Sequence, residues 1–275
     1  MALPDPSVVQ GPPGPPSQGP RQSLTAARLL NWSTWAAIAV LFGVSVQQTN
    51  FNLQVVAEGT GDFLRFFSRL APDWRALPQI WGPLVETLQI AWLGTVFGTI
   101  LGLPLIFLAS FNTTVNGPVM FVSRSILTLL RSIPDLLYAA ILAPILMIGP
   151  LPGVAALTLF TMAVLAKLAS EAVESIDPGP LEALKAVGAG RNRMIVFSVL
   201  PQVGATLTSF ILYVFEINVR ASVIIGLVGA GGIGNLINRY LSFFDYSGLG
   251  ALLIVVFGVV LAIDQLSVYL RSRLI

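Results

Sequence analysis

The sequence contains no cysteine and no histidine among its 275 residues. The absence of cysteine excludes disulfide bonds and thiolate chemistry. Without either residue type, the usual zinc sites and the Ser-His and Cys-His forms of nucleophilic catalysis are excluded as well. A metal held by carboxylates alone remains possible, but no pattern in the sequence indicates one. We therefore expect a protein that is not an enzyme.

Charged residues are scarce, and hydrophobic residues are abundant. Asp, Glu, Lys and Arg make up 10% of the chain and hydrophobic residues 55%, whereas about a quarter of the residues of a typical soluble domain are charged. No charge occurs between Thr87 and Ser123, which is far longer than the ~20 residues that one membrane span needs. One soluble core of this size cannot bury so much apolar surface, so we expect an all-α membrane protein.

Apolar runs separated by polar or turn-forming segments predict about six transmembrane helices. These runs cover approximately residues 32–46, 83–110, 119–146, 154–169, 194–227 and 249–268. Arg21 and Arg28 precede the first run, and Arg271 and Arg273 follow the last. Because cytoplasmic flanks are rich in Lys and Arg, both termini are predicted to lie in the cytoplasm.

The first third of the chain divides into two segments before the main membrane domain. Residues 1–28 are rich in proline and poor in large apolar groups, which predicts a disordered cytoplasmic tail. Residues 29–82 contain the first predicted span and then Phe63, Phe66 and Phe67 at helical spacing. This pattern indicates an amphipathic helix on the outer membrane surface. Simple interfacial packing and docking of an extracytoplasmic partner both remain open for it.

A stripe of small residues runs along the second predicted span. Gly94, Gly98 and Gly102 recur every four residues, so they share one face of a helix. Such a stripe allows another helix to approach closely, and we expect it to pack in the core of the membrane domain.

The longest polar interruption in the membrane domain begins near residue 175. Asp177 starts a turn and Pro180 suits the first position of a helix, while Gly188 and Gly190 suit its end. About ten residues form a helix roughly 15 Å long, which is too short to span a bilayer. We predict a short cytoplasmic helix within residues 175–190.

The two faces of this short helix differ in polarity. Leu181, Leu184 and Val187 recur every three residues and share an apolar face. Glu182 and Lys185 can form an ion pair on the other side. An amphipathic helix between two spans suits docking of a partner from outside the membrane, and a surface helix without a partner is the alternative.

Three polar residues fall inside the fifth predicted span. Charges in a membrane are rare and are functional candidates, so Glu216, Asn218 and Arg220 are candidates for a translocation path. The alternative is an internal ion pair, because Glu216 and Arg220 lie four residues apart. Arg131, near the middle of the third span, could join Arg220 in facing an anion, since a guanidinium binds a phosphoryl group through two hydrogen bonds.

A glycine-rich segment follows the fifth predicted span. Gly229, Gly231, Gly232 and Gly234 do not form a dinucleotide-binding motif, and the chain contains no P-loop motif. We therefore expect no nucleotide or other cofactor bound by this chain. A sharp turn or a gate is favoured, and a broken helix whose amide groups meet an anionic substrate is the alternative.

The polar interruption resembles the EAA loop of ABC importer permeases. That loop reads E-A-A, three residues, G, nine residues, I, any residue, L-P. The chain has Glu182-Ala183, then Gly188, then Leu200-Pro201 at this spacing, and it departs from the pattern at Leu184 and Ser198. The resemblance implies a type I ABC importer permease fold over residues 83–275.

In that family the loop is a coupling helix that docks in a groove of an ATP-hydrolysing subunit. The resemblance thus implies that Glu182 anchors the helix and that Gly188 permits the turn after it. The apolar face described above would fill the groove, with Leu200 and Pro201 completing the motif.

Further segments resemble a narrower group, the permeases of phosphonate importers. These are RSIPDLLYA at residues 131–139 and FEINVRASVIIGLVGAGGIG at residues 215–234. The resemblance implies import of a phosphonate, phosphite or phosphate across a bacterial inner membrane. It also implies a second permease subunit (this chain or a close relative), two ATPase subunits holding ATP and Mg, and an extracytoplasmic binding protein. The alternatives are a permease for methionine, whose importers share the EAA loop, and a carrier driven by an ion gradient.

Overall fold

The computed structural model describes residues 24–49 and 51–274, and within them it leaves out the side chains of residues 24–31, 53 and 55–57. All regular secondary structure in this described part is helical. The chain divides into two compact units, residues 1–63 and 64–275. The predicted Pro-rich tail lies mostly in residues 1–23, outside the described residues.

The first unit contains helix α1 (Leu24–Gln48) and the beginning of α2 (Leu53–Arg69). Helix α1 therefore begins inside the segment predicted as a tail. From Trp32 onward nearly all of its side chains are exposed, including Trp32 at 75% and Phe42 at 70%. An apolar helix with this much exposed surface needs lipid or another protein around it. That it forms the first span stays a prediction.

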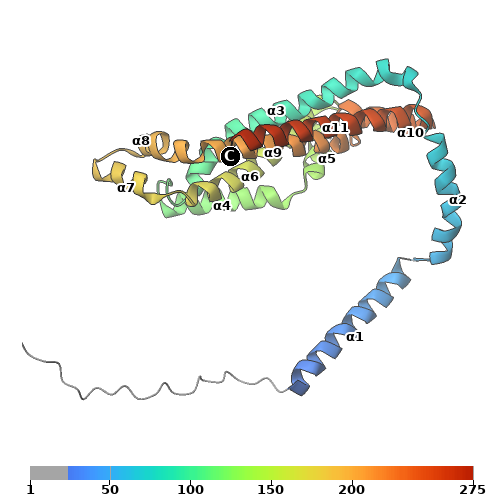
Figure 1. Ribbon diagram of the computed structural model, residues 1–275, viewed down its shortest axis with the longest axis horizontal. Coiled ribbons are helices and arrows are strands. Elements are labelled where there is room, and N and C mark those ends of the chain that lie inside the picture. Colours follow the sequence, from blue (N-terminus) through green and yellow to red (C-terminus); the bar gives the residue numbers. More distant parts are fainter. Residues whose placement is uncertain (1–23, 50, 275) are drawn as a thin grey trace, which may run out of the picture. The chain divides into compact units, whose positions relative to one another are not determined.

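The second unit holds the remaining helices. In chain order they are α3 (Leu77–Ala109), α4 (Gly117–Ser132), α5 (Asp135–Leu146), α6 (Pro150–Glu174), α7 (Pro178–Ala186), α8 (Arg191–Met194), α9 (Leu200–Gly226), α10 (Gly232–Ser242) and α11 (Tyr246–Leu274). A 3-10 turn, Trp74–Ala76, precedes α3, and a π-helical turn, Ile195–Val199, joins α8 to α9. Within this unit α7 and α8 lie together at one end and α10 lies at the other (Figure 1).

Four stretches of the described chain are long and apolar enough to cross a membrane: Trp74–Ala109, Pro150–Glu174, Arg191–Gly226 and Tyr246–Leu274. The bent pair α4 and α5 makes a fifth if it is counted as one span. The predicted first span falls in α1, which is not one of the four.

The third predicted span, residues 119–146, is not one straight helix. It is divided into α4 and α5, which meet at 86°. The break follows from Pro134, which lacks an amide hydrogen and disfavours helical angles at the residue before it. Ile133 is accordingly extended, with φ −94° and ψ 123°.

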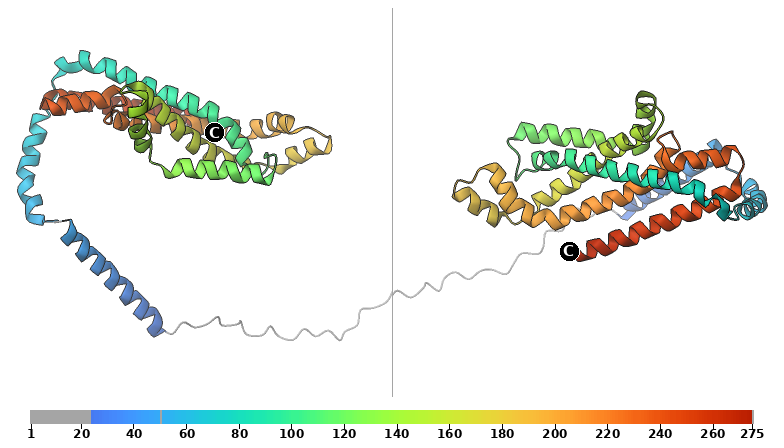
Figure 2. Two further views of the ribbon diagram at one scale, coloured as in Figure 1. Left: turned by 180° about the vertical axis from the view of Figure 1, so that it is seen from behind. Right: turned by 90° about the horizontal axis from the view of Figure 1, so that it is seen from above.

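Helices α3 and α6 pack closely side by side, as Figure 2 shows for the second unit. A Cβ added to Gly94 would collide with Leu157, and one added to Gly98 would collide with Thr161. Contacts that advance by four residues on both helices show that they run parallel. The predicted role of the glycine stripe in core packing is confirmed.

Candidate functional site

Helix α7 is short, as predicted, but it begins at Pro178 and not at Pro180, because Asp177 is its N-cap. The carboxylate of Asp177 accepts a hydrogen bond from the Gly179 amide at 2.9 Å and caps the helix start. Gly188 has a φ of +74°, and its amide donates to the carbonyl of Lys185 at 3.0 Å. The Ala189 amide donates to the Leu184 carbonyl at 2.9 Å, which completes a Schellman motif. Glycine is favoured at this left-handed position because it has no Cβ.

The three apolar residues predicted to share one face of α7 lie in different environments. Leu181 is only 5% exposed and packs in a cluster with Ile106 and Val203. Leu184 is half-buried, whereas Val187 is 78% exposed. Because Leu181 is held inside this chain, the prediction that it fills a groove of another subunit is corrected. It anchors the start of α7 to the ends of α3 and α9.

The other residues of the EAA-like motif lie as follows. Glu182 and Ala183 are exposed on α7, and among the described residues no ion pair joins Glu182 to Lys185. Leu200 and Pro201 open α9 directly after the π-helical turn. Pro201 has no amide hydrogen to donate, and it directly follows the π-helical turn within the helical stretch Arg191–Gly226.

Gln202, which the sequence analysis did not single out, ties the start of α7 to α9. Its side-chain oxygen accepts from the Asp177 amide at 3.0 Å. Its side-chain nitrogen donates to the Asp177 carbonyl at 3.4 Å and to the Ser198 carbonyl at 3.1 Å. A lone exposed glutamine carries no signal in a single sequence that would reveal this role.

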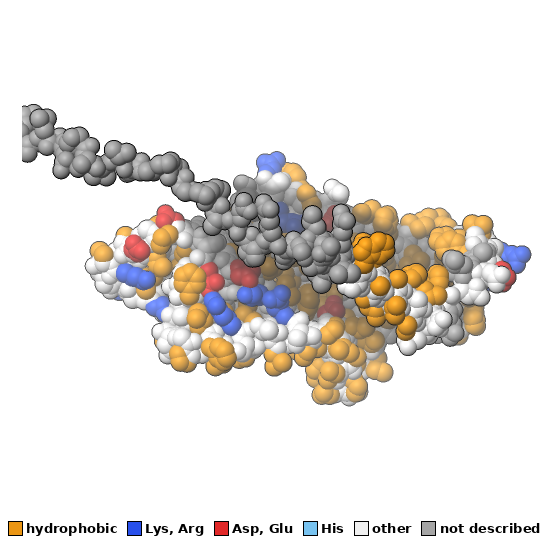
Figure 3. Space-filling model, turned by 90° about the horizontal axis from the view of Figure 1, so that it is seen from below, with side chains coloured by type: hydrophobic (Ala, Val, Ile, Leu, Met, Phe, Trp, Pro, Cys, Tyr) orange, Lys and Arg blue, Asp and Glu red, His pale blue; other side chains and the backbone are white. Residues whose placement is uncertain are grey.

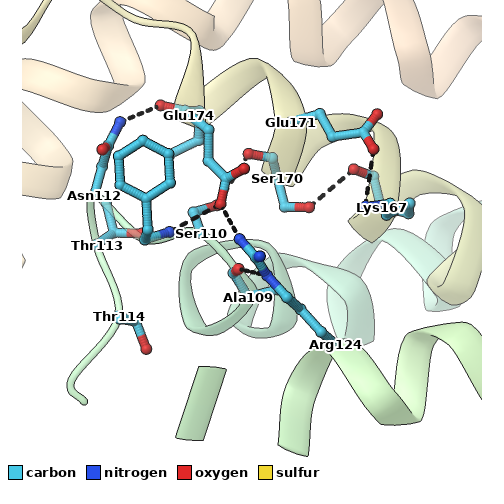
Figure 4. Close-up of polar contacts among 12 residues, drawn as sticks. Ala109, Ser110, Asn112, Thr113, Thr114, Arg124, Lys167, Ser170, Glu171 and Glu174 are labelled. Atoms are coloured by element: carbon cyan, nitrogen blue, oxygen red, sulfur yellow. Dashed lines mark hydrogen bonds and ion pairs between the residues drawn. The ribbon is translucent and has the colours of Figure 1, made fainter. Parts of the chain in front are cut away.

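Figure 4 shows a polar cluster at the end of α6, centred on Glu174. One oxygen of Glu174 accepts from the Phe111 amide at 3.0 Å and also pairs with Arg124 of α4. The Nε of Arg124 donates to the Ala109 carbonyl at 2.8 Å. Asn112 donates to a carbonyl in the last turn of α6 at 2.9 Å. The cluster therefore joins the ends of α3, α4 and α6.

A further hydrogen bond reaches this region from beyond α7. Arg191, the first residue of α8, donates through Nε to the carbonyl of Thr113. The partners of Arg191 and Glu174 lie dozens of residues away in sequence, so local spacing could not have predicted these contacts.

The buried carboxylate of Glu216 binds two arginines. The residue is 6% exposed. One of its oxygens pairs with Arg220, one turn later on α9, and the other with Arg271 of α11 at 2.9 Å. The predicted pair of Glu216 and Arg220 is confirmed, and Arg271 is a partner that the sequence analysis missed. The Arg220 side chain is 49% exposed, whereas that of Arg271 is 25% exposed and lies over the Tyr213 ring at 5.9 Å.

Asn218 does not line a path, contrary to expectation. It is fully buried, and its amide nitrogen donates to the hydroxyl of Thr95 at 2.8 Å and to that of Thr161 at 2.7 Å. It therefore links α9 to α3 and α6. Its amide nitrogen thus finds both acceptors inside the bundle, where lipid offers none, whereas its side-chain oxygen is buried without a partner among the described residues.

The glycine-rich segment forms a tight turn between α9 and α10. Gly229, Gly231 and Gly232 all have positive φ angles, of 94°, 84° and 65°. The fourth glycine, Gly234, packs directly against the backbone of Gly226. These features confirm the predicted sharp turn. A function as a gate stays a prediction.

Arg131 lies exposed in the last turn of α4, and no contact with Arg220 is recorded among the described residues. A groove of about 460 Å³ lies along this helix and is lined by residues that include Arg124, Thr128 and Ser132 but not Arg131. Arg131 follows Arg124 by two helical turns, so both lie on the same side of α4. Figure 3 shows acidic and basic side chains gathered in the part of the second unit towards α7.

A second cavity, of about 380 Å³, lies between α3, α9 and α11. It is lined by apolar side chains such as Trp92, Phe215 and Leu270, and no charged group faces it. An oxyanion would lose its hydration there without compensation. This cavity is therefore not a candidate for an anion path.

Comparison with known proteins defines the class of this membrane protein. Its fold resembles the methionine ABC transporter MetNI in inward-facing conformations, with a TM-score of 0.65 and 21% identity over 74% of this chain and 99% of that one. The helices and the α7 loop thus form a type I ABC importer permease fold, as predicted. Residues 102–275 match the family described as the binding-protein-dependent transport system inner membrane component.

Two curated relatives agree with this assignment. The chain is 36% identical over 211 residues to the phosphate-import permease protein PhnE of Mycolicibacterium smegmatis, covering 76% of this chain and 40% of that protein. It is 33% identical over 247 residues to the phosphite transport system permease protein PtxC of Stutzerimonas stutzeri, covering 88% of this chain and 90% of that protein. The chain therefore belongs to the family of binding-protein-dependent transport system inner membrane components, whose members are permease subunits and not catalytic.

Proposed function

We propose that this chain is the permease subunit of an ATP-driven importer for a phosphorus oxyanion such as phosphonate, phosphite or phosphate. The names of its relatives in M. smegmatis and S. stutzeri support this substrate class. The observation that carries the proposal is the arrangement of Arg220, Glu216 and Arg271. One buried carboxylate is shared by two guanidinium groups, so the group keeps a net positive charge. Uncompensated charge within a membrane protein favours binding of a counter-ion.

Arg220 is the arginine that can meet the substrate. About half of its side chain is exposed, and its guanidinium retains donors that Glu216 does not use, since arginine carries five. A planar guanidinium binds the oxygens of a phosphoryl group in pairs. The complex must stay weak so that the ion can leave, and sharing Arg220 with Glu216 weakens it.

Helix α4 offers a second surface for the same path. Its groove presents Ser125, Thr128 and Ser132. The hydroxyl groups of Thr128 and Ser132 donate to carbonyls of their own helix and remain as acceptors for water. Arg131 on the same helix is exposed, and it forms no ion pair with another of the described residues. In a chain with so few charges, an exposed polar stripe suits a water-filled path better than lipid.

The proposed assembly contains two permease subunits, either two copies of this chain or this chain with a close relative. Two ATPase subunits hold ATP and Mg and bind the α7 loops, where Glu182 and Val187 are exposed. An extracytoplasmic protein delivers the substrate. In this assembly the chain lies in a bacterial inner membrane with both termini in the cytoplasm. Helix α7 lies on the same cytoplasmic side, where the ATPase subunits bind. This chain itself binds no cofactor.

The deciding experiment measures ATP hydrolysis by the assembled complex in lipid nanodiscs with its binding protein. Phosphonate, phosphite, phosphate, sulfate and methionine are each added in turn. We expect at least fivefold stimulation by one phosphorus oxyanion and none by methionine. Stimulation by methionine alone would assign the other substrate class. Uptake that follows an ion gradient without any associated ATPase would refute the proposal and favour a gradient-driven carrier.

A further inference from the structure

The short linker between α6 and α7 is held from two sides. It begins at Glu174, the last residue of α6, and ends at Asp177, the cap of α7. A linker of this length could act as a free hinge that lets α7 move alone. The hydrogen bonds of its two end residues argue against a free hinge, because each end is tied to a different helix.

The first tie runs from Glu174 to the α4 side. Its carboxylate accepts from the Phe111 amide, in the loop before α4, and pairs with Arg124 within α4. The Glu174 side chain is 22% exposed and that of Arg124 is 43% exposed, so the pair is only partly shielded from water. Arg124 is fixed in turn by its bond to the Ala109 carbonyl. Movement of the linker therefore pulls on α4.

The second tie runs from Asp177 to α9. Gln202 both accepts from the Asp177 amide and donates to the Asp177 carbonyl. Because these two bonds hold the peptide groups on either side of the Asp177 Cα, they fix the orientation of its backbone as well as its position. The third bond, to the Ser198 carbonyl in the π-helical turn, holds the Gln202 side chain in place on its own helix.

These two ties lead to the two helices that carry the candidate path arginines. Helix α4 carries Arg131, and α9 carries Arg220. We propose that Glu174 and Gln202 are positioning residues that convert a displacement of α7 into movement of α4 and α9 together. This inference rests on the proposed function, because it assigns α7 as the contact with the ATPase.

The test uses variants that remove each tie while keeping side-chain size. Glu174→Gln keeps an acceptor for the Phe111 amide but removes the charge opposite Arg124. Gln202→Met removes all three hydrogen bonds. One matched control is Glu171→Gln, because among the described residues Glu171 pairs with Lys167 of its own helix, at 2.8 Å. The other is Gln265→Met, at an exposed position of α11.

The readout is the amount of phosphorus oxyanion transported per ATP hydrolysed by the whole complex in proteoliposomes. We expect about a threefold fall for each single variant and about a tenfold fall for the double variant, with hydrolysis itself retained. A merely structural role would lower transport and hydrolysis in parallel and leave their ratio unchanged, which would overturn the inference. Wild-type complex that shows no ATP-dependent uptake would instead refute the proposed function.

A measurement on the unmodified complex covers the case in which a variant does not fold. Hydrogen exchange at the Asp177 amide should be as slow as exchange in the interior of α9, both with and without ATP. Rapid exchange at Asp177 in either state would show that the linker is a free hinge and would overturn the inference.

Discussion

Glu216 shows how one carboxylate can bind two cations and leave one of them available. Its two oxygens take different arginines, one from its own helix and one from α11. Arg271 is the more enclosed of the two and is also placed against an aromatic ring. It is therefore the structural partner, and Arg220, which reaches the surface, is the functional one.

The first prediction separates these two roles. Arg220→Gln should leave Glu216 paired with Arg271, so the amount of protein in the membrane should stay within twofold of wild type while uptake falls at least tenfold. Glu216→Ala leaves two arginines without a buried partner, and breaking such a pair typically destabilises by about 3–5 kcal/mol. We expect its membrane level to fall severalfold. Quantitative immunoblotting and uptake of labelled substrate measure both quantities.

Arg271→Gln serves as the comparison for this pair of variants. It keeps the pair of Glu216 with Arg220 but removes the link to α11, so it should reduce the protein level more than uptake per molecule. Normal uptake by Arg220→Gln would contradict the assignment of that residue to the oxyanion path.

For individual residues, the sequence predicted contacts between residues of the same helix. The pair of Glu216 and Arg220 follows from their spacing of four residues. Arg271 is 55 residues from Glu216, so only the packing of α11 on α9 reveals it. Asn218 was misassigned because a polar residue in a span suggests a path, whereas its two hydroxyl partners come from other helices.

Among the elements, the presence of a short helix at α7 was predicted because it depends on local residues, although the helix begins two residues before the predicted Pro180. The Asp177 cap and the glycine after the helix act through their own backbone geometry. The burial of Leu181 depends on α3 and α9 and was not predicted. The break between α4 and α5 was also missed, although Pro134 was visible, because periodicity cannot distinguish a bent helix pair from one continuous apolar run.

The second prediction tests the end of α7 with two glycines that lie two residues apart. Gly188 has a left-handed φ of +74°, whereas Gly190 has an ordinary φ of −68°. A Cβ at either position meets no atom within 4 Å. Gly188→Ala therefore adds only backbone strain, of about 1–2 kcal/mol, and Gly190→Ala adds none.

We expect Gly188→Ala to lower ATP-coupled uptake at least threefold while the protein remains in the membrane, and Gly190→Ala to behave as wild type. Uptake and protein level in the same membranes provide the measurement. Equal uptake by the two variants would show that the left-handed turn does not matter for coupling.

For the molecule as a whole, composition predicted a multi-span helical membrane protein, and the fold agrees. The sequence predicts the class better than the number of spans, because length and polarity alone do not distinguish a continuous span from a bent helix pair such as α4 and α5. The same fold also shows which apolar side chains are buried within this chain and which are exposed and available to contact a partner. On α7, Leu181 is enclosed by its own chain and Val187 is exposed.

Charge placed at these two α7 positions should therefore have opposite effects on folding and assembly. Val187→Asp alters an exposed side chain, so the permease should reach the membrane at a normal level but lose most of the ATPase that copurifies with it. Leu181→Asp places an unpaired carboxylate in a buried cluster, which is strongly unfavourable, and should lower the level of permease itself. Copurification from detergent, normalised to permease, distinguishes the two results. If Val187→Asp retains its full complement of ATPase, the exposed end of α7 is not the surface that the ATPase binds.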